Sequence, residues 1–324
     1  MALSIGIVGL PNVGKSTLFN AMLKKQQALA ANYPFATIEP NIGVVPVPDE
    51  RLSKLAEVVK TEKIVPATVK FVDIAGLVKG ASQGEGLGNK FLAHIREVDA
   101  ICHVVRVFSD SDIIREGSTD PKSDFEIVKT ELDLADLETV ERRAKKKGVI
   151  EDELPLLAKK PIIVVLNVDE GDLLKSDELE SKYAGELGVG RECVVAICAK
   201  TESELASLSE DEQREYLAQL GVTKSGLERL ITRAFETLGL QTFLTAGEKE
   251  ARAWTIKIGM KAPQAAGVIH GDFEKHFIKA DCINWEEFVT LGGWQKAREV
   301  GAVRMEGREY VMQEGDVVEF KVGV

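Results

Sequence analysis

The chain has 324 residues, of which 44% are hydrophobic and 29% charged, and its formal net charge at pH 7 is −11. This composition is typical of a globular protein with about two or three domains, and the acidic balance argues against a surface that binds nucleic acid throughout. No apolar run approaches the ~18 residues of a membrane span, the start lacks the basic residues of a signal peptide, and the four cysteines form no CxxC pair. We therefore expect a cytoplasmic protein with reduced thiols and no membrane partner.

The first predicted elements are a buried strand at residues 3–8 and a helix at 17–25, joined by a glycine-rich loop. The loop reads GLPNVGKS, and a strand, such a loop and a helix in this order form a phosphate-binding P-loop. Its glycines let backbone N–H groups point at phosphate, and the helix N-terminus adds partial positive charge. Lys15 should reach the β- and γ-phosphates. The nucleotide contacts predicted in this stretch are Asn12, Val13, Gly14, Lys15, Ser16 and Thr17.

Two further parts of the phosphate site follow in the chain. Thr37 lies between the first helix and a strand predicted at 43–47, where P-loop enzymes place a threonine that closes over Mg²⁺ and the γ-phosphate. A strand predicted at 69–72 ends at Asp73, a carboxylate suited to the Mg²⁺ shell, and the N–H of Gly76 can approach the γ-phosphate because no side chain blocks it. The predicted catalytic residues are Lys15, Thr37 and Gly76, and the predicted Mg²⁺ ligands are Ser16, Thr37 and Asp73.

Strands are also predicted at 100–107, 161–166 and 193–197, and their alternation with helices indicates an α/β fold with a mostly parallel sheet. Asn167-Val168-Asp169-Glu170 occupies the place of the N-K-x-D tetrad that reads guanine in GTPases. The lysine is absent, the fourth position carries an extra methylene, and Asp169 is one residue out of register. We therefore predict that ATP binds more tightly than GTP. The predicted base-side contacts are Asn167, Val168, Glu170, Cys198, Ala199 and Lys200.

Between residues 107 and 161 the pattern changes to a polar linker and a long amphipathic helix. The helix ends in a basic cluster, which is either a phosphate-binding face or a solvated helix end. From about residue 240 a third composition predicts a small α+β module, with a strand at 254–258, a helix near 267–279 and short strands near 303–305, 310–312 and 317–322. The basic cluster consists of Arg142, Arg143, Lys145, Lys146 and Lys147.

Over most of its length the chain resembles the Obg-like ATPases, the YchF subfamily of translation-factor-class P-loop NTPases. The motifs that carry the resemblance are GLPNVGKS, NYPFATIEPN, DIAGLVKGASQGEGLGN, NVDE, FLTAGEKEARAWTI and APQAAGVIHGDFEKHFIKA. The resemblance implies a P-loop domain in two pieces, 1–115 and 161–240, an inserted coiled-coil-like helical arm at 116–160, and a ubiquitin-like β-grasp TGS domain at 241–324. It also implies Mg²⁺-dependent ATP hydrolysis and binding to the ribosome or its RNA, and we expect a monomer.

The chain departs from the family in two places. The helical arm is short, and Arg115 stands where family members usually have a histidine proposed to reach the γ-phosphate, so that catalytic histidine is not carried over. Leu77 also replaces the water-orienting glutamine of Ras-type enzymes, which predicts slow basal hydrolysis. Asn12 either helps to hold K⁺ between the phosphates or serves as a turn residue. The histidines that we assign no chemistry are His94, His103, His270 and His276.

Three functions are consistent with these features. The leading one is an ATPase that uses hydrolysis to switch its affinity for a translation partner. The alternatives are a GTPase of the Obg type and a nucleotide-gated ribosome- or RNA-binding protein whose hydrolysis is incidental.

Overall fold

The computed structural model describes residues 3–32, 41–74, 87–109, 120–144 and 155–323. The chain divides into two compact units, each built from two separate stretches of sequence. The first unit contains Met1–Val45 and Val69–Leu238, and the second contains Pro46–Thr68 and Gly239–Val324.

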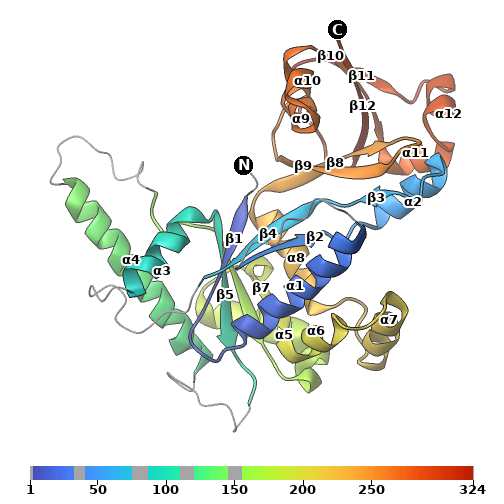
Figure 1. Ribbon diagram of the computed structural model, residues 1–324. Helices are drawn as coiled ribbons and strands as arrows, with labels where there is room; N and C mark the ends of the chain where they lie inside the picture. The colour runs from blue at the N-terminus through green and yellow to red at the C-terminus, as the bar shows by residue number, and fades with distance from the viewer. Residues whose placement is uncertain (1–2, 33–40, 75–86, 110–119, 145–154, 324) are drawn as a thin grey trace. The chain divides into compact units, whose positions relative to one another are not determined.

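The first unit is built on a six-stranded sheet in the order β2-β4-β1-β5-β6-β7 (Figure 1). Strand β1 pairs in parallel with β4 and β5, and β6 pairs in parallel with β5 and β7, so the predicted parallel sheet is confirmed. Every residue of β1, β5 and β7 is buried, as expected for a parallel sheet covered on both faces. The strands are β1 Ser4–Val8, β2 Ile42–Pro46, β4 Thr68–Asp73, β5 Ala100–Arg106, β6 Ile162–Asn167 and β7 Val194–Ile197.

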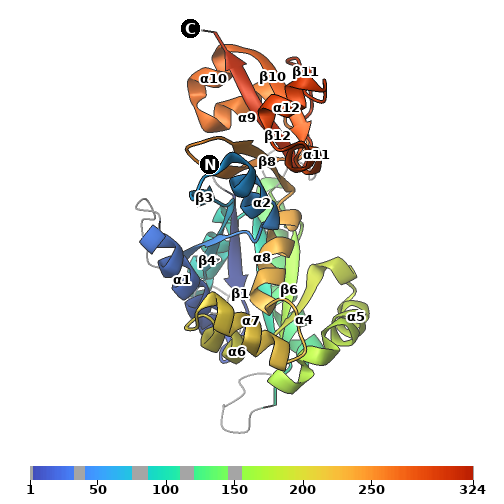
Figure 2. The same ribbon diagram turned by 90° about the vertical axis from the view of Figure 1, so that its right-hand side faces the viewer.

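Helices cover both faces of this sheet (Figures 1 and 2). Helix α8 is strongly amphipathic and begins at Ser225, whose side chain accepts the N–H of Glu228. Helix α5 ends at Gly188 in the left-handed conformation that glycine adopts without strain. The helical segments of this unit are α1 Lys15–Asn32, α3 Leu87–Glu97, α4 Pro121–Ala144, η3 Glu170–Lys175, α5 Ser176–Leu187, η4 Arg191–Cys193, α6 Ala199–Leu205, α7 Glu210–Gln219 and α8 Gly226–Thr237.

The described part of the inserted segment belongs to the first unit. Helix α4 has 24 residues, and Phe125 and Val128 near its start are buried. Further along, the carboxylate of Asp136 accepts the backbone N–H groups of Leu157 and Ala158, both at 2.8 Å. These hydrogen bonds join the two ends of the described part of the inserted segment, which was predicted as a helical arm at 116–160.

The second unit has its own six-stranded sheet, in the order β11-β10-β12-β8-β9-β3. Its core includes Phe243, which packs edge-on against Phe320 with ring centroids 5.6 Å apart. The helix predicted near 267–279 was wrong at its end. The helix α10 ends at Lys275, and residues 277–279 begin the strand β10. The strands are β3 Ile64–Val65, β8 Leu240–Ala246, β9 Ala251–Lys257, β10 Phe277–Asn284, β11 Arg304–Glu306 and β12 Asp316–Val322, and the helices are α2 Glu50–Val59, α9 Ala262–Ile269, α10 Gly271–Lys275, α11 Trp285–Leu291 and α12 Trp294–Glu299.

Residues 46–68 lie between β2 and β4 in sequence but belong to the second unit. Strand β3 pairs in parallel with β9, and the N–H of Ala251 donates to the carbonyl of Lys63 at 2.9 Å. On α2, Arg51 donates to the hydroxyl of Thr242 at 2.8 Å. The predicted piece 1–115 is therefore interrupted by residues 46–68. The two apolar residues of β3 are too short a run to predict a strand, and its partner β9 lies far along the chain.

Candidate nucleotide-binding site

The loop between β1 and α1 has the conformation that its glycines were expected to allow. Gly9 and Gly14 have φ values of +150° and +99°, and Asn12 has φ +60°, in the left-handed region that asparagine tolerates. A Cβ on Gly14 would lie 2.2 Å from Nδ2 of Asn167. Only glycine therefore fits at position 14, and the geometry of Asn12 agrees with a turn residue.

Lys15 and Asp73 form the charged part of the site. The Lys15 side chain is buried, and its Nζ donates to the carbonyl of Leu10 at 2.7 Å. Burial lowers the pKa of Lys15, and Asp73 opposes this shift; burial likewise raises the pKa of Asp73, and Lys15 opposes it. Both charges are thus partly desolvated and near one another. Ser16 lies next to Lys15 in the first turn of α1 and is exposed.

Asn167, at the end of β6, connects the P-loop to the start of α6. Its Nδ2 donates to the carbonyl of Val13 at 2.9 Å, and its Oδ1 accepts the N–H of Ala199 at 3.0 Å. The side chain is 5% exposed. The sequence predicted Asn167 as a base contact, and the structure adds this bridging role, which ties the loop before α1 to the start of α6.

The two middle residues of the tetrad are engaged with other parts of the first unit. Val168 is buried in the core, and its N–H donates to the carbonyl of Ile197 at 2.9 Å, so its side chain offers no surface to a ligand. Asp169 Oδ2 accepts hydrogen bonds from the N–H and hydroxyl of Ser109 at 3.0 and 3.1 Å. The position of Asp169 agrees with the expectation that its carboxylate points elsewhere.

Glu170 is held by residues that sequence reasoning missed. Its Oε2 accepts hydrogen bonds from Thr201 Oγ1 at 3.0 Å and from the hydroxyl of Tyr216 at 3.1 Å. The Tyr216 hydroxyl also lies 3.2 Å from Glu204 Oε2. Burial and the two carboxylates raise the pKa of Tyr216 to about 12. Nothing in the sequence pattern distinguished this threonine and tyrosine from ordinary helix residues.

The other predicted base-side contacts lie at the start of α6, and His103 lies on β5. Cys198 precedes α6 and is buried with Ala199, whereas Lys200 is exposed. His103 on β5 is 1% exposed and stacks on Phe125, with ring centroids 5.2 Å apart. Burial, with a smaller effect of Lys15, lowers the pKa of His103 to about 3, so the ring is neutral at pH 7. This agrees with assigning it no proton-transfer role.

Several predicted residues cannot be placed. Thr37, Gly76, Leu77, Arg115 and the lysines at 145–147 lie outside the described residues, as do the side chains of Arg142 and Arg143. Among the residues that the structure describes, no cluster of three or more histidine, cysteine, aspartate or glutamate side chains could hold a metal ion. Within the same residues, no helix has the length and apolar character needed to cross a membrane.

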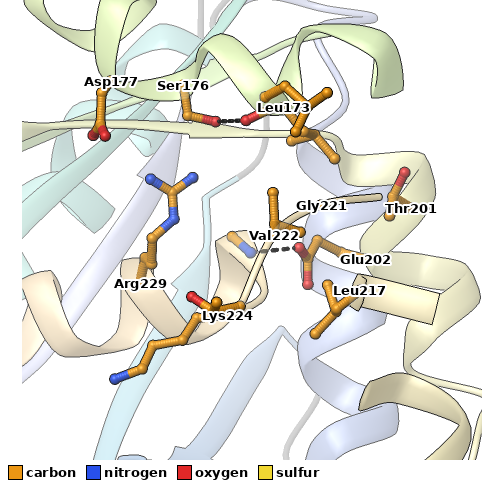
Figure 3. Close-up of a pocket in the computed structure, with 13 residues that line it drawn as sticks. Leu173, Ser176, Asp177, Thr201, Glu202, Leu217, Gly221, Val222, Lys224 and Arg229 are labelled. Carbon is orange, nitrogen blue, oxygen red and sulfur yellow. Dashed lines mark hydrogen bonds between the residues drawn. The ribbon is translucent and has the colours of Figure 1, made fainter. Parts of the chain in front are cut away.

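A cavity of about 340 Å³ lies beside the Thr201 side of the site (Figure 3). Glu202 borders it and accepts the N–H of Gly226 at 2.7 Å, at the start of α8. Burial raises the pKa of Glu202, while hydrogen bonds from the start of α8 oppose the shift. The described lining residues come from η3, α5, α6, α7, α8 and the loop before α8, not from the P-loop.

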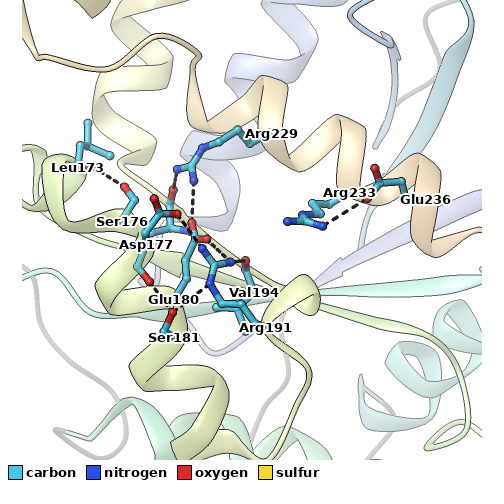
Figure 4. A network of polar contacts seen from close by, with 11 residues as sticks. Leu173, Ser176, Asp177, Glu180, Ser181, Arg191, Val194, Arg229, Arg233 and Glu236 are labelled. Carbon is cyan, nitrogen blue, oxygen red and sulfur yellow. Dashed lines mark hydrogen bonds and ion pairs between the residues drawn. The ribbon is translucent and has the colours of Figure 1, made fainter.

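An ionic network supports the strand that leads to Cys198 (Figure 4). Glu180 on α5 is buried and accepts the N–H of Ala196 on β7 at 2.8 Å. Its carboxylate also pairs with Arg229 at 2.8 Å and with Arg191 at 2.5 Å. The buried carboxylate is thus compensated by two guanidinium groups, and the network joins α5, β7 and α8.

Comparison with known proteins adds the following similarities. A family model described as a 50S ribosome-binding GTPase matches residues 4–168, and a model of the C-terminal part of YchF GTPases, described as a protein of unknown function, matches residues 240–323. A Bacillus subtilis (strain 168) protein named "Ribosome-binding ATPase YchF" is 48% identical over 370 aligned positions, which cover 100% of both chains. A Haemophilus influenzae protein of the same name is 47% identical over 367 positions, again with 100% coverage of both.

A solved structure is similar as well. The "Schizosaccharomyces pombe YchF GTPase" has a TM-score of 0.82 and 37% identity, over 98% of this chain and 97% of that one. The alignment with the Bacillus protein spans 370 positions, more than the 324 residues of this chain, so that relative contains residues without a counterpart here.

Proposed function

The chain belongs to the YchF family, and from this premise we propose that it is a Mg²⁺-dependent ATPase that cleaves the β–γ bond of ATP and binds ribosomes. The names of its relatives support both halves of the proposal, since they describe a ribosome-binding ATPase. A ribosomal partner also agrees with the expected cytoplasmic location. We propose that the protein is a monomer. The ribosome would then be the partner whose binding responds to the nucleotide.

The residues at the phosphate end fit a magnesium nucleotide. Mg²⁺ prefers hard oxygen ligands, and the Ser16 hydroxyl and Asp73 carboxylate are of that kind. The half-buried Asp73 carboxylate has a raised pKa, so a divalent cation there would stabilise its charged form. Lys15, backbone N–H groups of the loop and the N-terminus of α1 would hold the phosphates, while Thr37 and Gly76 are proposed to complete the site on the γ-phosphate side.

One observation supports the proposed selectivity for ATP over GTP: the tetrad lacks the lysine and the fourth-position aspartate that read guanine. Val168 is buried where GTPases carry a lysine whose stem covers the base, and Asp169 is bonded to Ser109. Of the last three tetrad residues, only Glu170 is left to contact a base, and its carboxylate already accepts a hydrogen bond from Thr201. Loss of a bidentate charged contact removes most of the preference for guanine.

The second unit supports the proposed TGS assignment through its sheet. Its first and last long strands, β8 and β12, pair in parallel, and antiparallel partners flank them on both sides. Helix α9 packs against β9 and β10. A mixed sheet with this order and one crossing helix is the arrangement of a β-grasp domain. We propose that this unit and the basic cluster at 142–147 supply ribosome contacts.

The test is turnover of ATP and GTP, measured separately with and without ribosomes. We expect slow basal ATP hydrolysis at a rate that ribosomes change, slower hydrolysis of GTP, and loss of turnover in Lys15→Ala. The exposed Lys182 on α5 lies outside the predicted contacts, and Lys182→Ala serves as a charge-matched comparison for the P-loop lysine. Equal or better use of GTP would instead support an Obg-type GTPase, which the description of the Schizosaccharomyces structure as a GTPase favours. Ribosome binding without measurable hydrolysis would support a nucleotide-gated binding protein.

A further inference from the structure

The carboxylate at the fourth position of the tetrad is held by hydroxyl groups from two helices. Oε2 of Glu170 accepts hydrogen bonds from Thr201 on α6 and from Tyr216 on α7, at 3.0 and 3.1 Å. A carboxylate oxygen has two lone pairs, so both acceptor positions of this atom are used. Oε1 is then the oxygen that remains for a ligand.

This arrangement bears on base selection, and the inference therefore rests on the proposed ATP preference. A carboxylate that reads guanine accepts two adjacent N–H groups, and a bidentate contact of this kind needs both of its oxygens. We propose that Thr201 and Tyr216 are specificity-determining positioning residues, which hold Oε2 of Glu170 so that the carboxylate cannot grip guanine. Neither residue needs to touch the nucleotide for this effect.

The hydrogen bond from Thr201 restrains the Glu170 carboxylate because Thr201 is itself buried and fixed in α6. Thr201 is 1% exposed, and it lies on the same helix as Ala199, whose N–H donates to Asn167. Both ends of the tetrad are therefore bonded to the first turn of α6. To turn its carboxylate toward guanine, Glu170 would have to leave a buried hydroxyl without its acceptor, which costs free energy.

Glu204 competes for the same phenol. Tyr216 has one proton to donate and lies within hydrogen-bonding distance of both Glu170 and Glu204. A glutamine at position 204 can donate its amide to the phenolic oxygen, which leaves the phenolic proton for Glu170. The substitution Glu204→Gln should therefore strengthen the hold, in the direction opposite to that of removing the hydroxyl.

The experiment compares dissociation constants for ATP and GTP in the full chain, by titration of the wild type and of Tyr216→Phe, Thr201→Val and the double variant. We expect the Kd ratio of GTP to ATP to fall about threefold in Tyr216→Phe and about tenfold in the double variant, through tighter GTP binding. Glu204→Gln should leave the ratio unchanged or raise it. Tyr183→Phe, which removes a phenol outside this cluster, is the matched control and should not change the ratio.

The outcomes separate the inference from the function on which it rests. A ratio that stays at the wild-type value in both Tyr216→Phe and the double variant overturns the inference, as does an equal loss of affinity for both nucleotides together with a lower Tm, because that pattern marks a purely structural role. Tyr216 is half-buried, so its phenylalanine variant remains informative if Thr201→Val folds poorly. A wild-type chain that binds GTP as tightly as ATP overturns the proposed selectivity itself, before any variant is measured.

Discussion

Asn167 and Val13 are joined by a hydrogen bond of 2.9 Å, from the side-chain nitrogen of the first to the backbone oxygen of the second. The bond ties the base side of the site to the P-loop, and the other atom of the same amide holds Ala199. One buried side chain therefore sets the spacing of the two loops that would enclose a nucleotide.

Replacing Asn167 by alanine should destabilise the protein and weaken nucleotide binding together. The change leaves a buried carbonyl and a buried N–H without a partner, which costs about 2–4 kcal/mol in the free energy of unfolding. Chemical denaturation and ATP titration would measure the two effects. Asn20→Ala, on the exposed side of α1, is the control and should change the free energy of unfolding by under ~0.5 kcal/mol.

Gly14→Ala should abolish nucleotide binding. Its Cβ would lie 2.2 Å from Asn167 Nδ2, at a φ of +99° that alanine does not readily adopt. A Cβ on Gly185 of α5 would meet nothing within 4 Å, so Gly185→Ala should bind ATP normally and stabilise the fold by up to ~1 kcal/mol. If Gly14→Ala bound ATP with the wild-type Kd, the P-loop assignment would be wrong.

The protein should lose stability as pH falls from about 6.5 to 3 because of His103. Burial lowers the pKa of His103 in the folded chain to about 3, whereas the unfolded chain binds this proton near the usual histidine value of 6.5. The unfolded state therefore binds more protons in this window, and the free energy of unfolding decreases by about 2 kcal/mol between pH 7 and pH 5. Denaturation of His103→Phe across this range should show a shallower pH dependence, while the exposed-site control His270→Gln should follow the wild type.

Potassium should raise ATP turnover relative to sodium if Asn12 helps to hold a cation between the phosphates. Rates measured at equal ionic strength in the two salts would show the effect, and Asn12→Gly, which keeps the left-handed backbone but removes the side-chain oxygen, should erase it. The same rate in both salts would leave Asn12 with its turn role alone, as its φ of +60° already suggests.

Sequence reasoning located β1, β5, β6 and β7 well because these are buried parallel strands and thus nearly continuous apolar runs; β5, at Ala100–Arg106, was predicted to within one residue. It identified the P-loop and the tetrad because their residues are neighbours in the chain. It missed Thr201 and Tyr216 because these reach Glu170 from separate helices, and nothing in a single-chain pattern encodes that meeting. Sequence reasoning also missed strand β3, because its partner β9 lies about 190 residues further along the chain.

The pairing of β3 with β9 has a consequence for how the protein is made. Ile64 emerges from a translating ribosome long before Ala251, its partner in the sheet. Until Ala251 is synthesised, β3 and α2 lack their partners in the second unit, while the first unit is also still incomplete. Contacts between residues this distant in sequence form slowly. A fragment that begins at residue 239 would likewise leave an edge of β9 unpaired and prone to associate with other chains. The C-terminal unit is therefore a late product of biosynthesis rather than a module that can be excised at a single cut.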